Sequence, residues 1–205
     1  DTLFGKRTIT SVNYDEQQII RDILYLHCNK QDIDCDPTYS VGNFYKHGLK
    51  RPTYCFDINP QLSYVQQADS RNIPLQNESV NVVMFDPPFI VGENAKEHKN
   101  NSIIRQRFSQ YKNMHELFEF YKQSINEIYR ILKSGGVLIF KCQDTVSSGK
   151  NYFSHVFVMN YATEKGFYAK DLFHLIAKNR IVDVAPENQQ HCRKFNSYFW
   201  VFEKK

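Results

Sequence analysis

Short apolar runs alternate with helix-like segments along most of the chain. The clearest run, VNVVMF at residues 80–85, predicts a strand with both faces buried, as in the middle of a parallel sheet. A similar run at 137–142 predicts a second buried strand, and shorter strands are expected to end near Asp36, Asp57 and Ala68. This alternation predicts an α/β fold, a doubly wound sheet with helices on both faces.

Helices are expected between and before these strands. Apolar positions recur with helical spacing after Asn13 and Asp15, either of which can cap a helix that runs to about Cys28. The remaining elements are predicted as helices at 115–132 and 153–165 and as strands at 170–177 and 197–204.

A polar segment at residues 90–113 separates the strand at 80–85 from the next helix. It is long for a connection in a compact α/β domain, and such loops are usually lids or mobile segments. We therefore predict a mobile substrate loop here. Its basic residues are Lys96, Lys99, Arg105, Arg107 and Lys112.

Composition narrows the classes of protein that need to be considered. Of the 205 residues, 41% are hydrophobic and 23% are charged, a composition that excludes a mainly disordered protein. Five cysteines without paired spacing support neither a disulfide scaffold nor a zinc site, so no metal is expected. Because no apolar run reaches the ~18 residues of a membrane span and none resembles a signal peptide, we expect a soluble intracellular chain with no membrane partner. The net charge of +4 permits a polyanionic partner without requiring one.

Four aspartates follow successive predicted strands. Asp36, Asp57, Asp69 and Asp86 each come at or just after the carboxyl end of a strand, where open α/β sheets bind their ligands. Each one alone could be a turn or cap residue. Four at successive strand ends favour a ligand site.

The tetrapeptide DPPF at residues 86–89 is the most specific local feature. Two prolines fix φ twice and leave the carbonyls of Asp86 and Pro87 as rigid acceptors. A carboxylate beside a fixed carbonyl suits an NH2 group, which has two protons to donate, and Phe89 offers a flat surface for stacking a heterocycle. A Pro-Pro turn followed by a core phenylalanine is the alternative.

The motif in this setting resembles [DNS]-P-P-[YFW], the catalytic motif of S-adenosylmethionine-dependent amino-methyltransferases that modify adenine, or less often cytosine. The stretch SRNIPLQNESVNVVMFDPPF and the later LKSGGVLIF are also similar to that family, so the resemblance covers about residues 30–145. It implies a single-domain, Rossmann-like class I methyltransferase fold with a mostly parallel seven-stranded sheet and an antiparallel C-terminal strand. Residues 1–205 would then form one catalytic domain with the loop at about 90–113.

One motif departs from the family pattern. The first motif usually resembles D-P-F-x-G-x-G, whose glycines let the backbone approach the cofactor. This chain has Asp36-Pro37-Thr38-Tyr39-Ser40-Val41-Gly42 instead. Ser40 replaces the first glycine, so we expect cofactor binding in this loop to be arranged differently.

The resemblance implies roles for individual residues toward S-adenosylmethionine. Asp57 would accept hydrogen bonds from the ribose hydroxyls, and Asp69 would accept one from the adenine amino group. Asp36 and Gly42 would face the methionine end. The expected cofactor-binding residues are Asp36, Pro37, Gly42, Asp57, Ile58, Asp69, Ser70 and Arg71.

On the target side, Asp86 and the Pro87 carbonyl would hold the amine, and Phe89 would stack on the base, so the expected catalytic residues are Asp86, Pro87, Pro88 and Phe89. Lys141 and Asp144 could touch substrate or cap the following turn. Besides the loop at 90–113, Arg193 and Lys194 are candidates for phosphate contact.

DNA is the expected partner and substrate, and RNA is the alternative substrate. Two other functions stay open: methylation of glutamine side chains in proteins, and a nucleic-acid-binding scaffold with a vestigial cofactor site. The chain has little room for target recognition, which would rest on the loop at about 90–113, on a second subunit (a homodimer partner or a separate specificity subunit), or on a piece upstream or downstream of this chain. The resemblance implies a cytoplasmic protein of the kind carried by bacteria and their phages.

Overall fold

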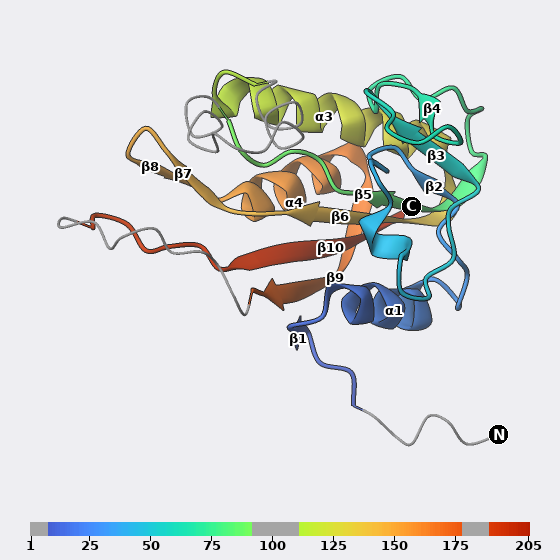
Figure 1. Cartoon of the computed structure of the whole chain (residues 1–205), viewed down its shortest axis with the longest axis horizontal. Helices are drawn as coiled ribbons and strands as arrows, with labels where there is room; N and C mark the ends of the chain where they lie inside the picture. Colours follow the sequence, from blue (N-terminus) through green and yellow to red (C-terminus); the bar gives the residue numbers. More distant parts are fainter. Residues whose placement is uncertain (1–7, 92–110, 178–188) are drawn as a thin grey trace.

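The computed structural model describes residues 8–91, 111–177 and 189–205, which form an α/β structure around one large sheet (Figure 1). In the described residues this sheet has eight strands in the order β1-β9-β10-β6-β5-β2-β3-β4. The strands are β1 (Val12–Asn13), β2 (Cys35–Asp36), β3 (Tyr54–Asp57), β4 (Gln66–Gln67), β5 (Val80–Phe85), β6 (Leu132–Cys142), β9 (Phe167–Ile176) and β10 (Asn196–Lys204). The other elements are α1 (Glu16–His27), the 3-10 helix η1 (Asn43–Tyr45), α3 (Met114–Ile131), α4 (Ser154–Lys165) and a separate hairpin, β7 (Thr145–Ser147) with β8 (Lys150–Tyr152).

The sheet is parallel from β4 through β6, and β10 lies antiparallel between β6 and β9. This confirms the predicted mostly parallel sheet with an antiparallel C-terminal strand. The expected number of strands was seven, and the additional one is β1, where Val12 and Asn13 pair with the outer edge of β9. Edge strands carry unpaired backbone groups, and even a two-residue strand satisfies some of them.

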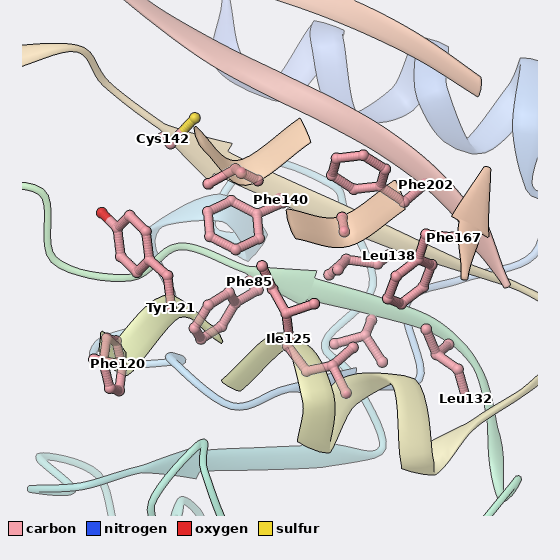
Figure 2. Packing of buried hydrophobic residues seen from close by; sticks show 14 of the residues in the cluster. Phe85, Phe120, Tyr121, Ile125, Leu132, Leu138, Phe140, Cys142, Phe167 and Phe202 are labelled. Carbon is pink, nitrogen blue, oxygen red and sulfur yellow. The ribbon is translucent and has the colours of Figure 1, made fainter. Parts of the chain in front are cut away.

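Helices cover both faces of the sheet: α1 lies on one face, and α3 with α4 on the other (Figure 1). The apolar run of β5 is continuous because its side chains alternate between two cores. Val83 and Phe85 pack in the cluster beneath α3, which Figure 2 shows, whereas Val82 and Met84 pack in the cluster beneath α1. Burial on both faces therefore accounts for the pattern that predicted this strand.

Side-chain caps set where the helices begin. The Asp15 carboxylate accepts hydrogen bonds from the N–H groups of Gln17 and Gln18, so Asp15 is the N-cap of α1. Of the two predicted candidates, Asn13 instead accepts from the N–H groups of Tyr14 and Asp15. Asn113 caps α3 by the same chemistry, through the N–H of Glu116.

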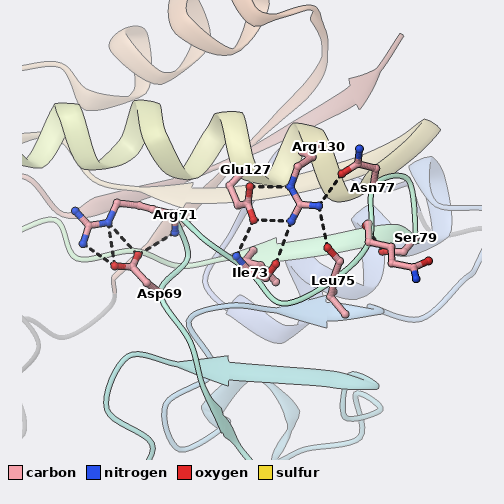
Figure 3. A network of polar contacts seen from close by, with 9 residues as sticks. Asp69, Arg71, Ile73, Leu75, Asn77, Ser79, Glu127 and Arg130 are labelled. Carbon is pink, nitrogen blue, oxygen red and sulfur yellow. Dashed lines mark hydrogen bonds and ion pairs between the residues drawn. The ribbon is translucent and has the colours of Figure 1, made fainter.

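The connections between β2, β3 and β4 differ from the expected strand–helix–strand alternation. Within the described residues, only the 3-10 helix η1 lies between β2 and β3, and the predicted third strand, near 65–68, shortens to Gln66–Gln67. After β4 the chain crosses to β5 as an irregular segment clamped onto α3. Glu127 accepts from the Ile73 N–H, and Arg130 donates to the Ile73 and Leu75 carbonyls (Figure 3). These polar contacts replace a helix as the support for this side of the sheet.

Two further features complete the comparison with the predicted elements. The hairpin β7–β8 was not expected; its turn contains Ser148 and Gly149 at φ of 49° and 72°, the left-handed conformation that tight hairpin turns require. The predicted substrate loop lies, except for a few residues at its two ends, outside the described residues. No helix in the described parts of the chain is both long and apolar enough to cross a membrane.

Candidate active site

A pocket opens at the carboxyl ends of β2, β3 and β5 and beside β4. It brings together residues from five separate segments of the chain, because parallel strands end at the same edge of the sheet. Its lining residues are Pro37, Thr38, Asp57, Ile58, Ala68, Asp69, Ser70, Asp86, Pro87, Pro88, Phe89 and Phe120. Most of the predicted site residues therefore share this pocket, whereas Asp36, Gly42 and Arg71 lie outside its wall.

Asp86 stands at the end of β5 with its side chain 27% exposed. Its N–H donates to Thr38 Oγ1 at 2.9 Å, which ties the end of β5 to the loop that follows β2. One carboxylate oxygen lies 3.5 Å from the Lys141 ammonium. The carboxylate is thus held at the pocket wall and remains open to a ligand.

The rest of the DPPF motif is held rigidly against α3. The Tyr121 hydroxyl donates to the Pro88 carbonyl at 2.6 Å, and Tyr121 itself is fully buried. Two consecutive prolines limit the remaining backbone freedom of the turn. Phe89 also lines the pocket.

Asp36 is buried behind the pocket wall and organises the loop that follows β2. Its carboxylate accepts from the Thr38 N–H and hydroxyl and from the Tyr45 hydroxyl, at 2.9, 3.1 and 2.8 Å. Burial raises the pKa of Asp36 to about 7; these hydrogen bonds oppose the rise, and the nearby charge of Asp86 adds to it. Among the described residues, the hydrogen-bond partners of the Asp36 carboxylate are the neutral groups of Thr38 and Tyr45.

The same loop accommodates the serine at the glycine position of the resembled motif. Ser40 adopts φ of 54°, the left-handed conformation that glycine takes without strain, and its N–H donates to Asp57 Oδ2 at 2.9 Å. Gly42, at φ of 66°, keeps the glycine that the motif requires, since a Cβ there would lie 2.5 Å from the Tyr39 hydroxyl oxygen. The loop thus keeps a left-handed conformation at position 40 despite the substitution.

Asp57 and Asp69 present carboxylates on the β3–β4 side of the pocket. Asp57 accepts the N–H groups of Ser40 and Asn59, at 2.9 and 2.8 Å, one on each oxygen. Asp57 also lines the pocket, so its carboxylate belongs to the surface that a ligand would meet. Ile58 is 45% exposed at the rim and offers an apolar surface beside Asp57.

Arg71 clamps Asp69 with two guanidinium nitrogens, Nε and Nη2, at 2.6 to 3.0 Å (Figure 3). This hydrogen-bonded ion pair holds the pKa of the Asp69 carboxyl below its usual value. The guanidinium lies 5.7 Å from the centre of the Phe120 ring, which also lines the pocket. Ser70 turns its hydroxyl away, toward Ser124 of α3 at 2.9 Å, so its side chain serves the fold.

Sequence reasoning did not identify Thr38, Phe120 or Tyr121 as site residues. Thr38 follows Asp36 by two positions, the spacing of an Asx turn, which was the one available signal. Phe120 and Tyr121 are adjacent aromatics in a predicted helix, and nothing in the pattern separated their role from ordinary core packing.

The structure also separates the two residues proposed near the end of the strand at 137–142. Lys141 faces Asp86, whereas Asp144 pairs with His155 at 2.7 Å and accepts that residue's N–H at the start of α4, so Asp144 acts as a cap. The predicted phosphate-contact residues Lys96, Lys99, Arg105 and Arg107 lie outside the described part of the chain. Arg193 is exposed, and the Lys194 ammonium lies 5.8 Å from the centre of the Phe153 ring.

Comparison with protein families finds one match. The model of the family N6_N4_Mtase, described as DNA methylase, matches residues 80–205. The matched region begins with β5, includes the DPPF motif and runs to the end of the chain. Comparison with curated proteins finds no match.

Solved structures share the fold at low sequence identity. TrmN from Thermus thermophilus is 15% identical, with 92% of this chain and 49% of that chain covered and a TM-score of 0.53. A SAM-dependent methyltransferase from Methanosarcina mazei is 9% identical, with 89% and 96% covered and a TM-score of 0.50. PvuII DNA methyltransferase, described as cytosine-N4-specific, is 18% identical, with 67% and 48% covered and a TM-score of 0.50. These likenesses confirm the class I methyltransferase fold, and the chain spans about half the length of the DNA methylase structures that it matches.

Proposed function

The chain belongs to the N6_N4_Mtase family of DNA methylases, and from this premise we propose that it transfers a methyl group from S-adenosylmethionine to an exocyclic amino group of DNA. Adenine is the proposed first target and cytosine the second, because the family that the motif resembles modifies adenine more often. The observation that carries the proposal is the partly exposed Asp86 carboxylate at the wall of a pocket that also contains Asp57 and Asp69.

The chemistry of the pocket fits the proposed cofactor. S-adenosylmethionine supplies a methyl group on a cationic sulfonium and also carries an ammonium, two ribose hydroxyls and an adenine. Asp57 would accept from the hydroxyls, and Asp69, oriented by Arg71, would accept from the adenine amino group; both residues line the pocket. Asp36, whose pKa burial raises to about 7, is a carboxylate that a nearby cationic group would stabilise in its ionised form.

On the target side, two acceptors would hold one amine. Exocyclic amines are weak nucleophiles because their lone pair is delocalised into the ring. The Asp86 carboxylate and the Pro87 carbonyl would each accept one N–H, which moves the nitrogen toward tetrahedral geometry and directs its lone pair out of the ring. The reaction is then a direct displacement without a covalent enzyme intermediate, and positioning and electrostatics provide most of the acceleration.

The target base must leave its stack to reach Asp86, so a duplex substrate implies base flipping at a cost of about a few kcal/mol. Phe89 supplies a ring at the pocket that can replace part of the lost stacking. The proposed contacts of the pocket are with the amine of the base and do not distinguish deoxyribose from ribose. RNA is therefore an alternative acceptor. Target recognition would rest on the loop at about 90–113, on a second copy, on a separate specificity subunit, or on further chain upstream or downstream.

The test is transfer of radiolabelled methyl groups from S-adenosylmethionine to pools of DNA, RNA and protein, followed by digestion and identification of the methylated base. We expect labelled DNA with N6-methyladenine, and a labelling rate at least about 100-fold lower with Asp86→Ala. Asp32→Ala is the matched control, because Asp32 is an exposed carboxylate paired with Lys50 outside the pocket. Label in the RNA or protein pool would show that the substrate is RNA or protein and not DNA. A chain that binds the cofactor but labels none of the pools would support the scaffold alternative.

A further inference from the structure

Lys141 is a largely enclosed cation beside the DPPF motif. Its side chain is 14% exposed, and its ammonium lies 5.1 Å from the centre of the Phe44 ring and 5.8 Å from that of Phe199. The same nitrogen lies 2.6 Å from Glu16 Oε1 and 3.5 Å from Asp86 Oδ2. This lysine of β6 therefore contacts two carboxylates, that of Glu16 in α1 and that of Asp86 at the pocket.

The arrangement follows from the topology. Phe85 of β5 is in register with Phe140 of β6, so the next residue on each strand, Asp86 and Lys141, lie side by side at the end of the sheet. Glu16 comes from the first turn of α1, on the face of the sheet opposite α3. Three segments that are distant in sequence thus meet at one ammonium group.

Charge balance keeps this lysine ionised. Burial alone lowers the pKa of a lysine, but the charges of Asp86 and Glu16 and their hydrogen bonds outweigh it, so the pKa of Lys141 lies above its usual value. A buried ion pair stabilises a fold little, and an apolar side chain between two phenylalanine rings would pack at least as well. Stability is therefore a weak reason for a lysine here.

The neighbours of Asp86 supply a stronger reason. Asp36 is buried and lies near enough for its carboxylate to repel that of Asp86. The Lys141 ammonium, 3.5 Å from one Asp86 oxygen, offsets this repulsion. The contact is too long for a strong hydrogen bond, so the Asp86 oxygens keep their lone pairs for the pocket.

We propose that Lys141 is a positioning residue that holds the Asp86 carboxylate aimed at the target amine, with Glu16 anchoring Lys141. This inference rests on the proposed function, since it assigns Lys141 to the acceptor side of the same site. It extends the active site into α1, which the DPPF motif and the family match do not include.

A double-mutant cycle tests the route through Asp86. The effect of Lys141→Met on the rate of single-turnover methyl transfer to DNA is measured in two backgrounds, the wild type and Asp86→Asn. We expect a loss of about tenfold or more in the wild type, with the cofactor Kd and the DNA KM within about twofold, and a loss of less than about twofold in Asp86→Asn. Lys141→Arg should recover most of the rate, because it restores the cation. Lys170→Met is the control, since it removes another lysine ion pair of the same sheet, with Glu203.

Equal losses from Lys141→Met in both backgrounds would overturn the inference, because the lysine would then act independently of Asp86. If Lys141→Met does not fold, Glu16→Gln is used in its place. We expect Glu16→Gln to lower the transfer rate less than Lys141→Met would, and to have no effect in the Asp86→Asn background. A loss of rate that persists in Asp86→Asn would contradict the proposed role of Glu16 as the anchor of Lys141. A wild-type chain that methylates no nucleic acid overturns the proposed function itself. An active wild type with additive losses overturns only the role of Lys141.

Discussion

The parts of the chain before and after the start of β5 are built in different ways. Before β5, the strands of the sheet are two to four residues long, and side-chain bonds to the backbone shape the loops between them. From β5 onward, strands of up to 11 residues and the helices α3 and α4 bury periodic apolar side chains. The family match covers only this second part, residues 80–205. Polar contacts thus shape the proposed cofactor half, and apolar burial shapes the half that carries DPPF.

One hydrogen bond shows how closely the halves are joined: the Asp86 N–H donates to Thr38 Oγ1, and Thr38 in turn donates to Asp36. If the division is functional, substitutions in one half should change methyl transfer, and substitutions in the other should change cofactor binding. The following variants break or sharpen that contrast.

Asp86→Ala should have the largest effect. Removing the carboxylate that accepts from the target amine should lower kcat by about 100- to 1000-fold, the size of effect seen when one preorganised polar contact to a transition state is deleted. The cofactor Kd should stay within about twofold. Single-turnover kinetics and isothermal titration calorimetry measure the two quantities. A matching increase in the cofactor Kd would mean that cofactor binding and methyl transfer are not separated between the two halves.

Asp57→Ala should give the reverse pattern. Two charge-assisted hydrogen bonds to the ribose would be lost, each contributing about 1.5 kcal/mol or more, so the cofactor Kd should rise by about 100-fold. The transfer rate at saturating cofactor should change much less. Calorimetric titration checks the affinity, and an unchanged Kd would remove Asp57 from the site.

Asp36→Asn should change how stability depends on pH. The folded-state pKa of about 7 lies above the usual 3.8, so folding favours protonated Asp36. That contribution is fully present below about pH 4 and is lost as the pH rises toward about 7. Relative to Asp36→Asn, the wild type should therefore lose up to about 1.4 kcal/mol of unfolding free energy per pH unit in this window. Urea unfolding between pH 4 and 8 measures the difference, and parallel curves would contradict the assignment.

Ser40→Gly should have the smallest effect. Glycine adopts the left-handed conformation without strain, and the buried Ser40 hydroxyl has no hydrogen-bond partner in the described structure. The unfolding free energy should rise by about 1 kcal/mol, while the bond from the position-40 N–H to Asp57 is kept. Ser40→Ala is the control, because it removes the hydroxyl but keeps the strain. A destabilised Ser40→Gly would show that the serine side chain contributes to the loop.

Most of the elements that could be predicted have strong periodic burial, although α4, expected at 153–165 and found at Ser154–Lys165, was predicted too. β5, β6, α3 and β10 lie within a few residues of the expected ranges, apart from the earlier start of β6 at Leu132, because each alternates between core and surface or is buried on both faces. The hairpin β7–β8 and the strand β1 escaped prediction, since so few residues carry no readable period, whereas strands were expected where the two-residue β2 and β4 lie. Among the site residues, aspartates at strand ends and DPPF were visible, whereas Thr38 and Tyr121 became apparent only through their contacts with Asp86 and Pro88.

The sequence by itself determined the α/β class, the order of the long elements and the position of DPPF at the end of a buried strand, because local periodicity and two adjacent prolines act within a short stretch of chain. Only the tertiary structure decided that Asp36 is buried behind the pocket, that Ser40 takes a left-handed conformation, and that Glu16 and Lys141 stand behind Asp86. These features depend on which strand ends and helix termini meet in space. Contacts between residues so far apart in sequence leave no periodic pattern in the chain.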